Sequence, residues 1–299
     1  MITNKKHWKN RWDSLTVKQS AREALEKSVG FTYRQAIGKL IYALVTCRPD
    51  ISYACIKLSQ YSAAPAAIHY EAVKQIYRYL HATVDRGIYY WRHSPHPDLP
   101  YQPHPTPYDD VNYDSQHSPE RLIPCDRTLT AAVDSDYAGD QQHRKSVTGV
   151  CVMLAGGTVL YKTQFQSTIA LSTTEAEFTA ACEAGKYILY LRTIMDEIGL
   201  DQNAATTLYE DNQGALLMGN AQRPTKRTRH MDVKHFALQQ WIEQDLITMK
   251  RINTHDNHSD VLTKATGRIL FYRHNDYLMG YHVPQYANHL IASTRSPET

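Results

Sequence analysis

The sequence lacks several features that would place it in other protein classes. Its 299 residues contain no apolar run long enough to form a transmembrane helix. Residues 1–9 are polar and basic, with no apolar stretch behind them, so we do not expect a secretory signal. The five cysteines are an odd number and include no C-x-x-C pair. These absences favour a reducing compartment, in which Cys151 and Cys182 fill small buried spaces.

A large excess of one charge is also missing. The net charge of +3 does not by itself indicate a nucleic-acid-binding protein. Basic residues gather at 5–11 and 223–234, whereas acidic residues gather where strands are predicted to end. A single charged run is most often a solvated surface. The length fits one or two domains with a sizeable core.

Changes in composition divide the chain into four segments. Residues 1–92 are interpreted as a small helical unit, with helical apolar spacing from 31 onward and a predicted strand at 87–91. Eight of the thirteen prolines lie between Pro95 and Pro124, so residues 93–127 are predicted to be a linker or insertion. Residues 128–266 carry an α/β pattern, and residues 267–299 are interpreted as a tail.

The α/β segment has a regular order of elements. Apolar and β-branched residues predict five strands, at 129–133, 146–154, 158–162, 206–210 and 246–252. Helices are predicted at 172–198, 213–218 and 231–244, and from 259 onward. The predicted fold class is therefore α/β, with a mixed five-stranded sheet flanked by helices and preceded by the mainly helical unit. The long helix can begin with a capping box of Ser172 and Glu175, or of Thr174 and Glu177.

Four acidic residues fall near the ends of these predicted elements, namely Asp134, Glu177, Asp211 and Asp260. Sites in open α/β sheets form at strand ends, so these carboxylates can converge. Gathered carboxylates repel one another, and Mg²⁺ or Mn²⁺ relieves that repulsion. Two such ions about 4 Å apart can support phosphodiester hydrolysis. The ordinary alternatives are a capping role for a glutamate in a first helical turn and a turn role for an aspartate after a strand.

Five stretches in this order resemble the ribonuclease H domain of copia-type LTR retrotransposon polyproteins. They are VDSDYAGD at 133–140, ALSTTEAEF at 170–178, YEDNQ at 209–213, TRHMDVK at 228–234 and SDVLTK at 259–264. Gly149 and Lys162 also fit the family pattern. Residues 33–42, 48–54 and 58–60 are similar to the segment that connects the reverse-transcriptase palm to ribonuclease H. The resemblance covers roughly residues 31–92 and 128–266.

The resemblance implies a ribonuclease H-like fold that cleaves the RNA strand of an RNA–DNA hybrid with two Mg²⁺ or Mn²⁺ ions. It places Asp134 between both ions, Glu177 and Asp211 on the leaving-group side, and Asp260 on the side that activates water. Two neighbouring acids, Asp136 and Glu175, rank second as ligands. Positions 134 and 136 lie on the same face of a strand, so Asp136 can also reach the site. Positions 175 and 177 point in different directions on a helix, so only one of these two glutamates can be a ligand.

Contacts to the hybrid are expected from small polar and basic residues. Ser135, Thr148, Asn212 and Gln213 are candidates for contacts to 2′-hydroxyl groups. Candidates for phosphate contacts are Lys162, Arg223, Lys226, Arg227 and Arg229. Many ribonucleases H have a mobile histidine near the last acid, but here His255 and His258 are interpreted as ordinary loop residues.

The departures from the family define the alternatives. The chain contains no Tyr-x-Asp-Asp motif, so we expect no polymerase activity from it alone. It resembles the C-terminal piece of a polyprotein whose missing palm and fingers are possible partners, working in cytoplasmic particles and then in the nucleus without contacting a membrane. The alternatives are an inactive remnant that still binds nucleic acid, and a nuclease of this fold that acts on DNA.

Overall fold

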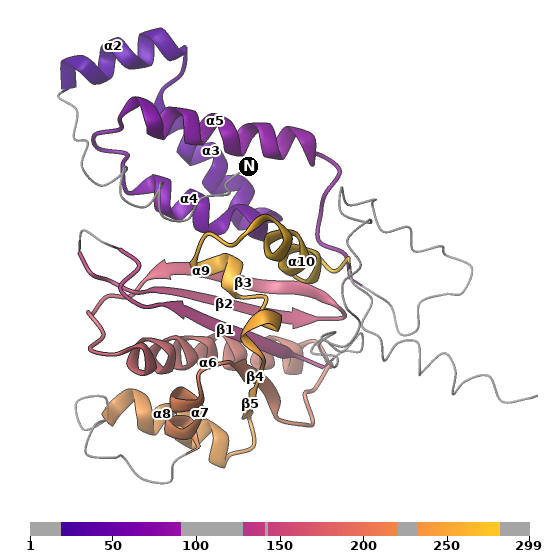
Figure 1. Cartoon of the computed structure of the whole chain (residues 1–299). Helices are drawn as coiled ribbons and strands as arrows, with labels where there is room; N and C mark the ends of the chain where they lie inside the picture. The colour runs from indigo at the N-terminus through magenta and orange to yellow at the C-terminus, as the bar shows by residue number, and fades with distance from the viewer. Residues whose placement is uncertain (1–18, 91–127, 141–142, 221–231, 282–299) are drawn as a thin grey trace, which may run out of the picture.

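A five-stranded sheet forms the centre of the molecule, with helices on both of its faces (Figure 1). The computed structural model describes residues 19–90, 128–140, 143–220 and 232–281. The strands are β1 (Thr130–Asp136), β2 (Val147–Leu154), β3 (Gly157–Phe165), β4 (Thr206–Glu210) and β5 (Ile247–Arg251). The helices that follow the first strand are α6 (Thr173–Glu197), α7 (Gln213–Gly219), α8 (Asp232–Glu243), α9 (Asp260–Thr263) and α10 (Arg268–Leu278).

The sheet has the strand order β3-β2-β1-β4-β5 and is mixed. The first three strands form an antiparallel meander, and β4 and β5 then add to the other side of β1 in parallel. Parallel strands need a crossover connection. Helix α6 lies in the connection that leads to β4, and α7 and α8 lie in the connection from β4 to β5. The predicted fold class is therefore confirmed, with most predicted bounds within two residues of those observed.

Apolar side chains cover both faces of the sheet. The larger core lies between the sheet and α6, with α7 and α8 closing it; Val133, Val150, Phe178, Leu216 and Leu238 are among its members. Figure 1 shows these three helices on one side of the sheet and α9 and α10 on the other. On that second side a smaller cluster joins the sheet to α9 and α10. A strand buried on both faces needs apolar residues at successive positions, as Ala131–Val133 provide.

The N-terminal helical unit has its own core. It consists of α2 (Gln19–Val29), α3 (Tyr33–Thr46), the short 3-10 helix η1 (Pro49–Ile51), α4 (Ser52–Ser59) and α5 (Ala67–Ala82). The predicted apolar positions Leu40, Leu58 and Val73 are buried at its centre. The strand predicted at 87–91 is not formed over its described part, residues 87–90. Instead, the backbone N–H of Tyr89 donates to the carbonyl of Met279 at 2.8 Å.

Part of the segment interpreted as a tail is an ordered helix. Helix α10 lies within residues 267–299, and its residues His274, Asn275 and Leu278 are buried. The sequence pattern does not indicate this helix, because its buried face carries polar residues that weaken the apolar periodicity typical of a packed helix. The remaining boundaries of the four segments stay predictions, and the whole of the segment 93–127 lies outside the described residues.

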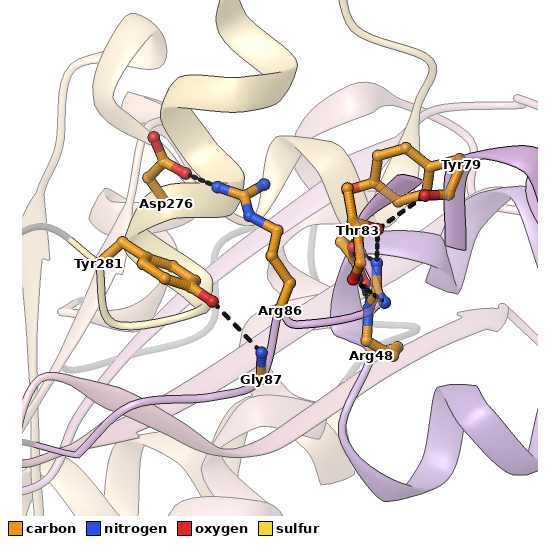
Figure 2. A network of polar contacts seen from close by, with 8 residues as sticks. Arg48, Tyr79, Thr83, Arg86, Gly87, Asp276 and Tyr281 are labelled. Carbon is orange, nitrogen blue, oxygen red and sulfur yellow. Dashed lines mark hydrogen bonds and ion pairs between the residues drawn. The ribbon is translucent and has the colours of Figure 1, made fainter. Parts of the chain in front are cut away.

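Polar contacts join the helical unit to the rest of the molecule (Figure 2). Arg86, which follows α5, forms a buried ion pair with Asp276 of α10 and lies over the ring of Tyr281. The hydroxyl of Tyr281 accepts a hydrogen bond from the backbone N–H of Gly87 at 3.2 Å. The hydroxyl of Tyr161 on β3 donates to the carbonyl of Leu44 on α3.

A second buried ion pair lies inside the helical unit beside this junction. The guanidinium of Arg48 contacts the carboxylate of Asp50 at 2.7 Å and donates to the carbonyl of Thr83 at 3.0 Å. The hydroxyl of Tyr79 donates to the same carboxylate at 2.7 Å. Both charges are therefore well compensated, and the chain that leaves α5 toward Arg86 is held in place (Figure 2).

None of the helices in the described residues combines the length and the apolar character needed to cross a membrane.

Candidate active site

Asp134 lies near the end of the central strand β1 and is only 2% exposed. Its Oδ2 accepts a hydrogen bond from the hydroxyl of Thr263, and its Oδ1 lies 3.5 Å from Nζ of Lys264. Both partners belong to α9 or follow it directly. One carboxylate therefore joins the strand to the helix that carries Asp260.

A glycine on the neighbouring strand makes this approach possible. Asp134 pairs with Gly149 of β2. A Cβ atom at Gly149 would lie 2.6 Å from Cγ2 of Thr263 and 2.9 Å from Cβ of Leu262, which is closer than packed atoms come. The missing side chain therefore gives α9 the space to pack directly on the sheet.

The loop before α9 is attached to β1 by a buried asparagine. Asn257 is fully buried, and its Nδ2 donates to the carbonyl of Val133 at 2.9 Å. Its Oδ1 accepts hydrogen bonds from Ser259. The contact is made one residue before Asp134, so it sets the position of Asp260 relative to Asp134.

Glu177 comes from α6, and its place in that helix differs from the prediction. The helix begins at Thr173 with Ser172 as its N-cap, whose hydroxyl accepts from the backbone N–H of Glu175 at 3.1 Å. Glu175 in turn accepts from the backbone N–H of Leu171 at 2.8 Å. Of the two capping alternatives, the structure forms the one that starts at Ser172, although the Glu175 side chain accepts from Leu171, one residue before the N-cap. Glu177 lies in the second helical turn rather than the first and is 7% exposed.

Strand β4 ends in a pair of acids that point to different surroundings. Glu210 is fully buried, and its Oε1 accepts from the backbone N–H of Asn212 at 3.0 Å. Asp211, the next residue, is partly exposed. Asn212 then caps α7, because its Oδ1 accepts from the backbone N–H of Ala215 at 3.0 Å. Asp211 therefore lies in the turn between β4 and α7, outside the strand itself.

Asp260 is the first residue of α9 and is buried. Its Oδ1 lies 2.9 Å from Nζ of Lys264, one helical turn later. Burial raises the pKa of Asp260, and the charge of Asp134 raises it further, whereas Lys264 acts in the opposite direction. Asp260 is therefore coupled directly to Asp134 through their charges and through a shared lysine.

Three of the four predicted acids meet. One carboxylate oxygen each of Asp134, Glu177 and Asp211 lies within 4.8 Å of the others. In the described part of the chain, Asp136 and Glu175 do not belong to this group. Burial raises the pKa of Glu177, and the charges of Asp134, Glu210 and Asp211 add to the shift. Burial and the charge of Asp134 also raise the pKa of Asp211.

The donor set of this group fits a hard divalent cation. Its donors are carboxylate oxygens, which Mg²⁺ and Mn²⁺ prefer. The buried Oε2 of Glu177 has no hydrogen-bond partner among the described residues, and the same holds for Oε2 of Glu210. A buried carboxylate oxygen without a partner is costly unless the group is protonated or a cation binds it. The residues present therefore fit the metal that the sequence predicted.

Two predicted nucleic-acid contacts lie in the interior. Ser135 and Thr148 are buried, and Nε2 of Gln166 donates to their hydroxyls at 3.4 and 3.0 Å. The same Nε2 donates to the carbonyl of Ala176 at 2.9 Å. These two hydroxyls therefore help to hold α6 against the sheet, and little of their surface is available to a ligand.

The remaining predicted contacts lie elsewhere. Lys162 on β3 and Gln213 at the start of α7 are exposed, and Asn212 is partly exposed. Arg223, Lys226, Arg227 and Arg229 lie outside the described residues. His255 is exposed in the loop before α9, whereas His258 is buried beside the ring of Tyr277.

Sequence reasoning missed Lys264 and Glu210 as members of the site's electrostatics. Lys264 follows Asp260 by four residues, the spacing at which side chains on a helix meet. That spacing was a usable signal. Glu210 gave none, because an acid that ends a strand beside another acid does not indicate which of the two turns inward.

The geometry and topology together define the class. A meander of three strands, a long helix and two further parallel strands, with acids grouped near the end of β1 and β4, form a ribonuclease H-like α/β fold with a candidate metal site. No family model matches the chain. Two curated relatives each align over 239 residues and 80% of this chain.

Those relatives are retrovirus-related Pol polyproteins. One, from transposon TNT 1-94 of Nicotiana tabacum, is 31% identical, and the other, from transposon RE2 of Arabidopsis thaliana, is 26% identical. The chain is a homologue of these copia-type retrotransposon Pol polyproteins. It spans only 16% and 14% of their respective lengths. A solved structure of LC11-RNase H1, isolated from compost, aligns with 46% of this chain and 93% of its own, at 13% identity and a TM-score of 0.36.

Proposed function

We propose that this chain hydrolyses the RNA strand of RNA–DNA hybrids in a reaction that depends on Mg²⁺ or Mn²⁺. The observation that carries the proposal is the convergence of Asp134, Glu177 and Asp211 from three separate elements. A fold gains no stability from gathering buried carboxylates, so their convergence favours a bound cation. The homology to Pol polyproteins supports a role within a retrotransposon.

Asp134, Glu177 and Asp211 would hold one cation, and Asp134 and Asp260 are the residues available for a second. Bound divalent ions supply a water of lowered pKa and positive charge for a leaving oxygen. The protein holds the carboxylates that would bind these ions in fixed positions. Asp134 is held by Thr263, and Glu177 is carried on a capped helix. Because neither carboxylate needs to reorganise, the site is arranged before a substrate arrives.

The exposed candidates for substrate contacts are Lys162 and Gln213, and Asn212 is a partly exposed one. Lys162 would contact a phosphate, and the two amides would contact sugar hydroxyl groups. The contacts proposed for Ser135 and Thr148 require exposure that the present arrangement does not give them, since both hydroxyls accept from Gln166. Arg229 remains a candidate for phosphate binding. The palm and fingers of a complete Pol polyprotein are proposed partners, and particles in the cytoplasm followed by the nucleus are the proposed sites of action.

Cleavage of a labelled RNA–DNA hybrid by the purified chain tests the proposal. The assay compares Mg²⁺, Mn²⁺ and EDTA, with Asp134→Asn and Asp211→Asn as site variants. We expect metal-dependent cleavage of the RNA strand and a loss of at least about 100-fold in each variant, because each change removes a charged ligand. Glu197→Gln, an exposed change at the far end of α6, serves as the control and should keep the activity.

The same assay separates the alternatives. Duplex DNA and single-stranded RNA are tested beside the hybrid. Cleavage of duplex DNA at a similar rate would assign a different nuclease activity to the same site. Salt-dependent binding of the hybrid without cleavage under any metal condition would leave an inactive nucleic-acid-binding protein and overturn the proposal.

A further inference from the structure

We propose that the ammonium group of Lys264 holds the Asp134–Asp260 side of the acidic cluster in the free protein. One divalent cation then binds at Asp134, Glu177 and Asp211, and a second is kept out by the lysine. This role rests on the proposed metal-dependent function. It adds to that function the residue that sets how many ions the free protein binds.

Lys264 contacts two of the four acids directly. Its Nζ lies 2.9 Å from Oδ1 of Asp260 and 3.5 Å from Oδ1 of Asp134. The side chains of the two aspartates are 8% and 3% exposed, whereas that of Lys264 is 30% exposed. The ammonium therefore reaches the buried carboxylates from the solvent side, along a partly exposed stem.

The other side of the cluster has no such cation. In the described residues, no lysine, arginine or histidine forms an ion pair with Glu177 or Asp211. The buried Oε2 of Glu177 has no hydrogen-bond partner there either. The cluster is thus asymmetric: Lys264 contacts Asp134 and Asp260, which form the compensated pair, whereas it acts on Glu177 and Asp211 only from a greater distance.

An ammonium and a divalent cation cannot share the compensated pair. A metal ion held by this pair would need to lie about 2.1 Å from oxygens of the same two carboxylates that Nζ contacts. Two positive charges at that separation would repel strongly in a buried site. The lysine is a flexible point charge, so it can withdraw when an anion such as a phosphate attracts it. Until then, a divalent cation binds most favourably beside Glu177 and Asp211, which Lys264 does not contact.

Counting bound Mn²⁺ in the purified, metal-free chain tests the role of Lys264. The electron paramagnetic resonance signal of free Mn²⁺ is measured as the ion is titrated into the protein, without nucleic acid. We expect one bound ion per wild-type chain and two per chain of Lys264→Met, with the first ion bound roughly tenfold more tightly in the variant because a nearby positive charge is gone.

Two further variants make the result specific. Lys264→Arg keeps the positive charge and should still bind one ion. Lys186→Met removes an exposed lysine of α6 that pairs with Glu183, and it should also bind one ion. Circular dichroism confirms that each variant is folded. If Lys264→Met does not fold, Lys264→Gln replaces it, and two ions bound to the wild type would overturn the role whatever the variants do.

The outcomes separate this role from the proposed function. Two ions bound per wild-type chain, or one ion bound in a folded Lys264→Met variant, would overturn the role of Lys264 and leave the metal site in place. No bound Mn²⁺ in any variant would instead overturn the metal site and the proposed function with it. One ion in the wild type and two in the variant would establish the role.

Discussion

At the scale of single residues, this site is dominated by buried charge. Glu177 and Glu210 each keep a buried carboxylate oxygen without a partner among the described residues, and burial raises the pKa of both groups. Asp134 and Asp260 are different, because Lys264 compensates them. Stability and function therefore compete at Glu177, and removal of its charge provides a direct test.

We expect Glu177→Gln to stabilise the metal-free protein. The substitution removes, at nearly constant volume, a buried carboxyl group that must either carry a charge repelled by Asp134 and Glu210 or take up a proton to fold. The melting temperature in EDTA should rise by about 2–5 °C, since about 1 kcal/mol shifts the melting temperature of a domain of this size by a few degrees. Addition of Mn²⁺ should stabilise the wild type and leave the variant nearly unchanged. A lower melting temperature in EDTA for a folded Glu177→Gln would contradict this account, and Glu197→Gln is the matched control.

A buried histidine in α10 should make the protein sensitive to acid. His274 is 1% exposed, and neither ring nitrogen has a partner among the described residues. Burial lowers the pKa of His274 from 6.5 to about 3, and nearby positive charges contribute to the shift. Those charges belong to His258, Arg273, Lys264 and His255. The unfolded chain thus binds a proton below pH 6.5 that the folded chain does not, so this contribution to stability falls from pH 6.5 down to about 3.

The test is the pH dependence of unfolding in urea. Between pH 7 and pH 5, the wild type should lose about 2 kcal/mol more of its free energy of unfolding than His274→Leu. The comparison uses the slope with pH, so a constant packing difference between the two proteins does not affect it. Equal slopes would show that His274 does not carry the effect.

At the scale of elements, the site depends on how closely α9 packs on the sheet. Gly149 of β2 gives that helix its space, while Asn257 attaches the preceding loop to β1. The catalytic candidates Asp134 and Asp260 therefore come together because a strand lacks a side chain. Gly149 fits the family pattern in the sequence, but only the tertiary structure shows that it lies against Leu262 and Thr263 of α9.

Gly149→Ala should displace α9. The new methyl group would lie 2.6 Å from Thr263 and 2.9 Å from Leu262, so the helix or the strand must move. We expect a loss of about 1–3 kcal/mol in the free energy of unfolding, together with weaker Mn²⁺ binding. Gly38→Ala in α3 is the control, because its methyl group meets nothing within 4 Å and should leave stability equal or up to about 1 kcal/mol higher. Equal effects of the two changes would exclude the packing explanation.

At the scale of the whole molecule, the helical unit and the sheet share a buried interface. Helix α10 lies between them, and its Asp276 forms a buried ion pair with Arg86 of the helical unit (Figure 2). Tyr161 and Tyr90 add hydrogen bonds from each side, to the carbonyls of Leu44 and Thr158. We therefore expect the two parts to unfold together in one transition.

Loss of Arg86 should disrupt that interface. Arg86→Met leaves the carboxylate of Asp276 buried without its ion-pair partner, which should cost about 3–5 kcal/mol in urea unfolding. The double variant Arg86→Met with Asp276→Leu should recover part of the loss. Lys74→Met, which removes an exposed ion pair with Glu71, should change stability by less than about 1 kcal/mol. A cost for Arg86→Met as small as that for Lys74→Met would show that the junction contributes little.

The sequence by itself determined the elements of the sheet and the identity of the acids. Strands such as Val147–Leu154 and the capped helix at Thr173 follow from local apolar patterns and local hydrogen bonds, which a linear pattern contains. The motifs around Asp134 and Asp211 likewise indicated the family. Helix α10 was missed because its buried residues are largely polar, and such residues are stabilised by distant partners.

Only the tertiary structure decided how those acids are paired and compensated. The ammonium of Lys264 meets Asp134, which is 130 residues away in the chain, and Arg86 meets Asp276 across 190 residues. Such contacts depend on how helices dock on a sheet, which sums many weak packing interactions over the whole molecule. Local spacing in the sequence does not contain these packing interactions. The sequence therefore identifies the acidic residues of the site, but not the cations that neutralise them.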